Sequence, residues 1–138
     1  CCLVTAENRP AGRLSASRVE RARRHLKSAR DLLANDDYAD SISRSYYTVF
    51  QAARALLATD HLESRKHSGG VALFNQHFVK SGRVAKHFGA VLKDAWRSRE
   101  LADYSDVAEF THDEAETQLR GATDSVEEIT RLLNEATG

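Results

Sequence analysis

Apolar residues recur at three- and four-residue intervals over most of this chain, and no other feature restricts its fold as much. In an α-helix this spacing places the apolar side chains on one face, whereas a half-buried strand alternates at every second residue. The strongest stripe starts near residue 37 and contains Ala39, Ile42, Tyr46, Val49, Ala53 and Leu56. We expect this segment to be a helix at the centre of the core.

Two more helices are expected around this central segment. Ser17 and Glu20 have the spacing of a capping box, so the first helix should run from residue 17 to about residue 34. A short helix is expected over residues 71–78, because the glycine pair at residues 69–70 should interrupt helical structure.

The C-terminal half contains two further amphipathic segments. Residues 84–101 form one, and Thr111 with Glu114 forms a capping box that begins a last helix ending near residue 133. We find no convincing strand. The sequence therefore predicts an all-α fold, an up-and-down bundle of four to five helices at 17–138, preceded by a flexible segment at 1–16.

Composition places the chain among soluble globular proteins without a global electrostatic field. It has 138 residues, 20 Lys and Arg against 20 Asp and Glu, and 41% hydrophobic residues. Cys1 and Cys2 are adjacent, so they cannot cross-link distant parts of a fold. The apolar runs are too short to span a bilayer. We expect a cytoplasmic protein with no membrane partner.

His67 and Arg44 are candidate binding residues in the N-terminal half of the chain. No histidine has a spacing that defines a metal site, so we expect neither a metal nor another cofactor. His67 precedes Ser68 and two glycines, a backbone that can approach a phosphate, although helix capping is the simpler explanation. Arg44 lies on the helix face opposite Ile42 and Tyr46. It should reach solvent or pair with an acid, and a structural role is favoured over direct ligand binding.

The stretch WRSRELADYSD, residues 96–106, gathers the other candidate residues where a helical pattern ends. Arginine grips phosphate in a fork, and tyrosine can stack on a base or receive a phosphoryl group. Arg97 and Tyr104 are seven residues apart, on one side of a helix that continues this far. The simpler interpretation is a set of exposed ion pairs at a helix end, formed among Arg97, Arg99, Glu100 and Asp103.

Three stretches carry a family resemblance: SISRSYYTVFQAARALL, RKHSGGVALFNQHFVKSG and RSRELADYSDVAEF, followed by an acid-rich amphipathic helix. In this order and spacing they resemble prokaryotic HEPN-domain proteins over about residues 17–133. The resemblance implies a helical bundle that usually dimerises. It also implies a relation to metal-independent endoribonucleases, often toxins encoded beside a minimal nucleotidyltransferase antitoxin.

The family's catalytic motif is an arginine followed after four to six residues by a histidine, in some members extended to histidine, any residue, tyrosine. Laid on this chain, the motif puts Arg97 at the arginine position and Tyr104 at the tyrosine position. Ala102 then stands where the histidine belongs, and a gap of five residues puts Asp103 there instead. Since neither residue moves a proton readily at neutral pH, the resemblance implies a family site without its catalytic histidine.

Three functional hypotheses follow from the sequence. The leading one is a homodimeric HEPN-like module of a toxin–antitoxin or nucleotidyltransferase-linked two-gene system. It would bind RNA or nucleotide at the dimer cleft through Arg97, Arg99, Arg44 and His67, without efficient cleavage. The second is an active endoribonuclease toxin that uses Arg97, Asp103 and Tyr104. The third is a helical interaction scaffold with no enzymatic site.

Overall fold

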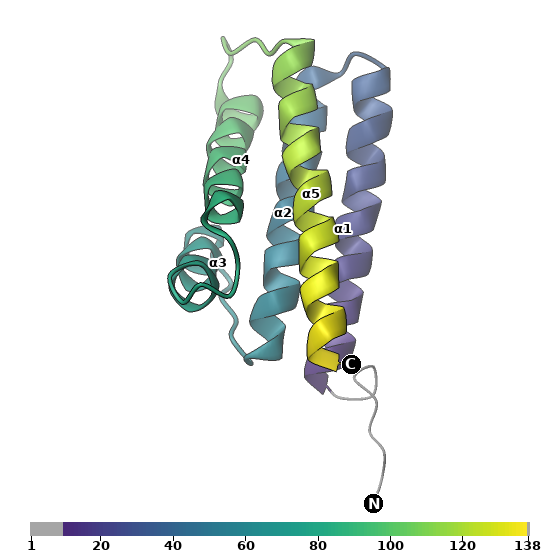
Figure 1. The fold of residues 1–138 in the computed structure, drawn as a ribbon. Coiled ribbons are helices and arrows are strands. Elements are labelled where there is room, and N and C mark those ends of the chain that lie inside the picture. Colours follow the sequence, from purple (N-terminus) through teal and green to yellow (C-terminus); the bar gives the residue numbers. More distant parts are fainter. Residues whose placement is uncertain (1–9, 138) are drawn as a thin grey trace, which may run out of the picture.

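The computed structural model describes residues 10–137, which form five α-helices and no strand (Figure 1). Three long helices lie side by side, a fourth packs next to the central one, and a short helix lies at one end of the fourth. The helices are α1 (Pro10–Ala34), α2 (Tyr38–Thr59), α3 (His67–Phe74), α4 (Lys86–Tyr104) and α5 (His112–Thr137). The predicted all-α bundle is confirmed.

Helix α2 is the centre of the core, as its apolar stripe predicts. It contacts each of the other four helices. Ile42, Tyr46 and Leu57 are almost fully buried along it, and each such side chain contributes roughly 1.5–3 kcal/mol through burial. The stripe therefore places Tyr46 in the interior, between the helices that carry the candidate site.

Helix α1 starts before the predicted capping box, so Ser17 and Glu20 lie inside the helix rather than at its end. Proline suits the first helical position, because its missing N–H has no partner there in any case. Farther along, the Ser15 hydroxyl donates to the Ala55 carbonyl at 2.7 Å and ties the early turns to α2. Residues 10–16 of the segment expected to be flexible are thus helical. Cys1 and Cys2 lie outside the described residues.

Helix α3 starts at His67 and includes the glycine pair that we expected to interrupt the helix. A Cβ at Gly69 would lie 2.1 Å from Ser64 Oγ, and one at Gly70 would lie 2.9 Å from Phe50 Cε1. Glycine is needed here so that the helix can approach α2 and the preceding loop, and this packing outweighs its low helix propensity. His67 is consequently held at a helix start.

The end of α4 lies three residues beyond the predicted end, at Tyr104. A single π-helical turn, Asn75–Val79, follows α3 and precedes the loop that leads to α4. Because α4 continues through Tyr104, Arg99 and Asp103 lie one helical turn apart on the same face.

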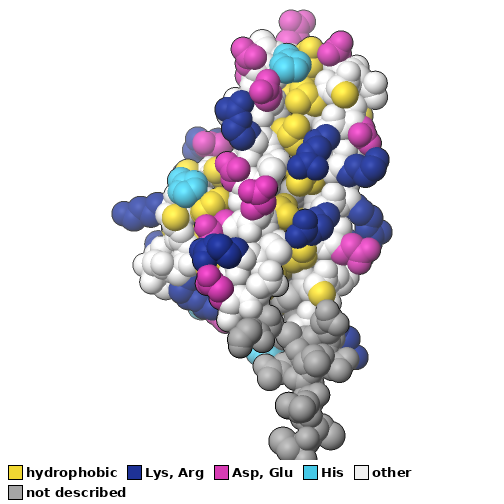
Figure 2. Space-filling model, turned by 45° about the vertical axis from the view of Figure 1, so that its right-hand side comes forward, with side chains coloured by type: hydrophobic (Ala, Val, Ile, Leu, Met, Phe, Trp, Pro, Cys, Tyr) yellow, Lys and Arg dark blue, Asp and Glu magenta, His cyan; other side chains and the backbone are white. Residues whose placement is uncertain are grey.

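Helix α5 begins as predicted, with the Thr111 hydroxyl accepting from the Glu114 amide at 3.1 Å. None of the helices in the described part of the chain is long and apolar enough to cross a membrane. Figure 2 shows a face on which Lys and Arg side chains are interspersed with Asp and Glu beside a hydrophobic band. The surface in this view has no field of one sign, which fits a formal net charge of zero.

Candidate functional site

Arg99 is the central cation of a polar and aromatic cluster formed by α2, α3 and α4. Its Nη2 donates to the Tyr47 hydroxyl at 2.9 Å. Its Cζ lies 5.7 Å from the ring centroid of Tyr46, and 5.4 Å from those of Tyr47 and Tyr104. These distances are within cation–π range. The side chain is only 11% exposed, so three tyrosine rings and the bundle surface hold the guanidinium in place.

Two acids on α4 accompany this guanidinium. Asp103 Oδ2 lies 2.8 Å from Arg99 Nε, and Glu100 Oε1 accepts from Arg99 Nη1 at 3.1 Å. The Nε contact is an ion pair without hydrogen-bond geometry, because the buried N–H finds no aligned acceptor among the described residues. Burial by itself would lower the pKa of Arg99, but the interactions with Tyr47 and Asp103 are larger in sum, so the pKa is raised above its ordinary value. Arg99 is therefore a permanent cation.

His67 joins the cluster through a hydrogen bond with Tyr46 of α2. Its Nδ1 lies 2.5 Å from the Tyr46 hydroxyl, a hydrogen bond that either tautomer of the imidazole can make. The imidazole stacks on Phe50 at a centroid distance of 4.5 Å and meets Tyr47 edge-on at 6.1 Å. Tyr46 thus contacts both His67 and Arg99, and it couples the start of α3 to α4.

The electrostatics of the pair favour neutral forms of both groups. Burial lowers the pKa of His67, and the positive charges of Arg99 and Arg54 lower it further. Burial also raises the pKa of the Tyr46 hydroxyl. At neutral pH His67 is therefore an uncharged imidazole beside a protonated phenol, and such an imidazole can accept a proton.

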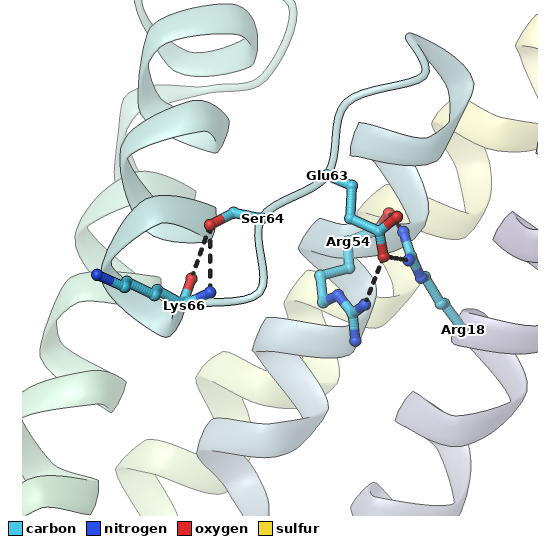
Figure 3. A network of polar contacts seen from close by, with 5 residues as sticks. All are labelled: Arg18, Arg54, Glu63, Ser64 and Lys66. Carbon is cyan, nitrogen blue, oxygen red and sulfur yellow. Dashed lines mark hydrogen bonds and ion pairs between the residues drawn. The ribbon is translucent and has the colours of Figure 1, made fainter.

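The loop before α3 is fixed by a charged network (Figure 3). Glu63 Oε1 accepts from Arg18 Nη2 at 2.8 Å and from Arg54 Nη2 at 3.2 Å. The hydroxyl of Ser64 accepts from the Lys66 amide and donates to the Lys66 carbonyl. Because these residues directly precede His67, the network sets where α3 and its first side chain lie.

The sequence pattern that defines the HEPN domain matches residues 15–136. This chain belongs to the HEPN-domain family. "Putative toxin MJ0605" of Methanocaldococcus jannaschii is 33% identical over 85% of this chain and 87% of its own. A "UPF0332 protein" of Thermotoga maritima is 34% identical over 83% of this chain and 87% of its own length. "Putative toxin MJ0142" of Methanocaldococcus jannaschii is 31% identical over 73% of this chain and 69% of its own length. The resemblance inferred from the three stretches is confirmed.

The HEPN fold brings together most, but not all, of the residues selected from the sequence. Arg99, Asp103 and Tyr104 lie in one cluster, and His67 reaches it through Tyr46. Arg97, which the family motif selects as catalytic, is exposed and makes no hydrogen bond or ion pair with any residue that the structure describes. The arginine inside the cluster is thus two residues farther along α4.

Arg44 borders this cluster on the α1 side. It pairs with no described acid; instead its Nη1 lies 3.4 Å from His25 Nδ1. The His25 ring lies 5.6 Å from that of Tyr47, which carries the contact on to Arg99. Burial and three arginines, Arg44 foremost, lower the pKa of His25. An open groove beside this pair is lined by Arg24, His25, Ser28, Asp31, Leu32 and Arg44.

The helical periodicity of α4 also indicates which of its two candidate arginines, Arg97 or Arg99, faces the bundle. Leu92 and Ala95 are on the inward stripe of α4, and Arg99 follows them by seven and four residues on the same face. Arg97 follows exposed Lys93 by four residues and shares its outward face. No spacing rule connects Tyr46 with His67, which lie on different helices, so this contact could not be predicted.

One further group of possible metal ligands lies away from the cluster. Within the described residues, His112, Asp113 and Glu116 bring three donor atoms together at the start of α5. Glu116 also pairs with Arg120 at 3.2 Å, and the positive end of the helix dipole disfavours a cation there. We assign no metal to this exposed group.

Proposed function

We propose that this HEPN protein binds single-stranded RNA through the cluster around Arg99. The observation that carries the proposal is the position of this guanidinium, which is bonded to Tyr47 and surrounded by the rings of Tyr46, Tyr47 and Tyr104. Arginine binds phosphate, and the exposed surface of the Tyr47 and Tyr104 rings can stack on unpaired bases, whereas Tyr46 is fully buried. Single strands offer both groups at once, whereas duplexes keep their bases stacked.

The acids in the cluster set the conditions for this binding. Glu100 is about half exposed, and exposed ion pairs contribute little stability, so a phosphate can replace its carboxylate on Nη1. Asp103 stays on the Nε side and holds the arginine in place. Binding should therefore depend on Arg99 and weaken as salt rises.

Arg44 extends the proposed binding surface toward α1, and His67 borders that surface at the start of α3. The Arg44 guanidinium contacts His25, whose ring contacts that of Tyr47, and both residues line the open groove beside α1. A strand that stacks a base on Tyr47 could place one phosphate at Arg99 and the next toward Arg44. Arg97 is exposed on the neighbouring face of α4 and remains a candidate for a phosphate that approaches from solvent.

We further propose that the protein is the toxin-like member of a two-gene pair with a minimal nucleotidyltransferase, acts in the cytoplasm and works as a homodimer. The HEPN assignment and the names of the two Methanocaldococcus jannaschii relatives support the toxin-like part. The exposed apolar side chains of Leu101 and Val107, beside the cluster, support a cleft between two copies.

Fluorescence anisotropy with a labelled single-stranded oligoribonucleotide tests RNA binding. Arg99→Gln should weaken binding at least about tenfold, since a charged phosphate contact is lost. Lys93→Gln is the matched control, because it removes one positive charge from an exposed position on the same helix. An equal loss in both variants would reduce the effect to net charge. If Arg97→Gln abolishes binding and Arg99→Gln does not, the phosphate is bound by Arg97, the arginine of the family motif. If the parent binds no RNA, the protein is better described as a helical interaction scaffold.

A working endoribonuclease is the second candidate function, and His67 is the observation that favours it. The family motif has Ala102 in place of its histidine, and Asp103 is held by Arg99. His67 nevertheless brings an uncharged imidazole to the same cluster from α3. Growth arrest on induced expression, absent in Arg99→Gln, would support this candidate.

A further inference from the structure

We propose that His67 is the catalytic base of RNA cleavage at this cluster and that Tyr46 is its positioning residue. The proposal rests on the proposed function, because it requires an RNA phosphate held at Arg99. It assigns the proton-accepting role to a residue of α3, outside the α4 stretch that carries the family motif.

One ring nitrogen of His67 is held and the other remains for a substrate. Nδ1 contacts the Tyr46 hydroxyl at 2.5 Å, and the stack on Phe50 at 4.5 Å fixes the plane of the ring. No hydrogen bond within the described residues engages Nε2. The imidazole is half-buried rather than enclosed, so a ribose can reach it. A base held at one nitrogen and open at the other is suited to general base catalysis.

Two adjacent tyrosines, Tyr46 and Tyr47, connect His67 to Arg99. Tyr46 bonds His67 with its hydroxyl, and its ring lies 5.7 Å from Arg99 Cζ. Tyr47 bonds Arg99 with its hydroxyl, and its ring lies 6.1 Å from that of His67. Arg99 and His67 therefore share both tyrosines as neighbours, and the proposal places the ribose of a phosphate bound at Arg99 on the His67 side of the cluster.

The proposed reaction is an intramolecular phosphoryl transfer. His67 Nε2 takes the proton of the ribose 2′-hydroxyl while Nδ1–H donates to the Tyr46 oxygen. The 2′-oxygen forms a bond to phosphorus, and the bond from phosphorus to the 5′-oxygen of the next nucleotide breaks. That oxygen takes a proton from water, and the imidazolium later returns its proton to solvent. The products are a 2′,3′-cyclic phosphate and a 5′-hydroxyl end. Arg99 stabilises the charge that builds on the phosphoryl oxygens.

The charged and titratable groups facing His67 determine the pH dependence. Arg54, Tyr46 and Tyr47 face it from α2, and Arg99 with Glu100 from α4. Burial and the two arginines lower its pKa, against a smaller opposite effect of Glu100. The neutral base is therefore the main form at neutral pH. Cleavage should be lost as pH falls through the His67 pKa, below the ordinary value for histidine.

The experiment measures binding and cleavage of one labelled oligoribonucleotide by the full chain. His67→Gln should bind RNA within about twofold of the parent and cleave it at least about 100-fold more slowly, which is the usual size of a general-base contribution. His87→Gln is the matched control, since it removes an exposed histidine from α4 and should cleave as the parent does. DNA of the same sequence, which lacks the 2′-hydroxyl, should remain intact.

Tyr46→Phe separates a positioned base from a merely structural histidine. It keeps the ring and removes the hydroxyl, so cleavage should slow and the acid limb of the pH profile should move to lower pH. That direction follows because Nδ1–H then loses an acceptor that favours the protonated ring. An unchanged acid limb in Tyr46→Phe would remove Tyr46 from the proposal.

The outcomes for the two proposals are distinguishable. RNA binding with no cleavage by the parent, or equal cleavage by the parent and His67→Gln, would overturn the role of His67 and leave RNA binding standing. If the parent binds no RNA, the proposed function itself fails.

Discussion

Arg18 on α1 donates to Glu63 at 2.8 Å in the loop before α3, although its own side chain is 5% exposed and that of Glu63 is 59% exposed. The nearly buried guanidinium of Arg18 is thus neutralised by the carboxylate of a solvent-exposed side chain, Glu63. The Arg54 carbonyl accepts a second hydrogen bond from it at 3.0 Å. The pair links α1 to the segment that positions His67.

Glu63→Ala should lower the free energy of unfolding by about 1–2 kcal/mol, since a buried cation loses a charged acceptor that is partly screened by water. Urea denaturation measures the change. Glu20→Ala is the control, because Glu20 pairs with Arg24 only at 3.6 Å on an exposed surface, and it should change stability by less than about 0.5 kcal/mol. Equal effects would mean that the Glu63 network does not hold the loop.

Gly70→Ala should destabilise the fold by about 1–2 kcal/mol, because its Cβ would lie 2.9 Å from Phe50 Cε1 and 3.1 Å from Cζ. Phe50 also supports the His67 ring, so cleavage should fall together with stability. A double-mutant cycle with Phe50→Leu measures the coupling by denaturation. Additive effects would show that the two residues do not collide.

The number and order of the helices could be predicted from the sequence because each has its own apolar stripe. The starts of α1 and α3 could not be predicted, because contacts between segments distant in the sequence determine them. Ser15 bonds α2 and accompanies the earlier start of α1, and close packing of Gly70 on Phe50 keeps the glycine pair helical. The Thr111 capping box is local and was predicted correctly.

The candidate site followed the same division. Arg99 and Asp103 are one turn apart on a single helix, so their ion pair is within reach of sequence reasoning. The choice between Arg97 and Arg99 depends on which face of α4 meets α2, and the motif spacing selected the outward residue. The contact between Tyr46 and His67 depends on how α3 packs, which no periodicity specifies.

Stability should fall as pH drops from about 7 to 5.5, because His25 and His67 have lowered pKa values in the folded protein. In that window the unfolded chain, with ordinary histidine pKa values near 6.5, binds more protons, and linkage then favours unfolding. Denaturant titrations at both pH values measure the drop. The double variant His25→Gln, His67→Gln should reduce it and His87→Gln should not. A drop of the same size in the double variant would assign it to other groups.

The proposed homodimer should use the end of α4 and the segment that follows it. Leu101 and Val107 are 52% and 88% exposed, whereas Trp96 packs partly against the core and is a weaker interface candidate. Light scattering at micromolar concentration should give about 31 kDa, twice the 15.4 kDa chain. Leu101→Glu with Val107→Glu should give a folded monomer. A monomeric parent, or a dimer unaffected by both charges, would contradict this interface.

Tyr104 is the proposed acceptor for nucleotide phosphate groups from a nucleotidyltransferase partner. It is the most exposed tyrosine of the cluster, and its ring lies 5.4 Å from Arg99 Cζ. A phosphate group on its hydroxyl would add negative charge close to Arg99, so it should occupy the arginine and weaken RNA binding. Intact-mass spectrometry after co-expression with the neighbouring gene should detect the adduct. Tyr47→Phe, which alters a less exposed tyrosine, should keep it and Tyr104→Phe should lose it. An adduct that persists in Tyr104→Phe, or none in the parent, would leave Tyr104 as a ring that packs beside Arg99.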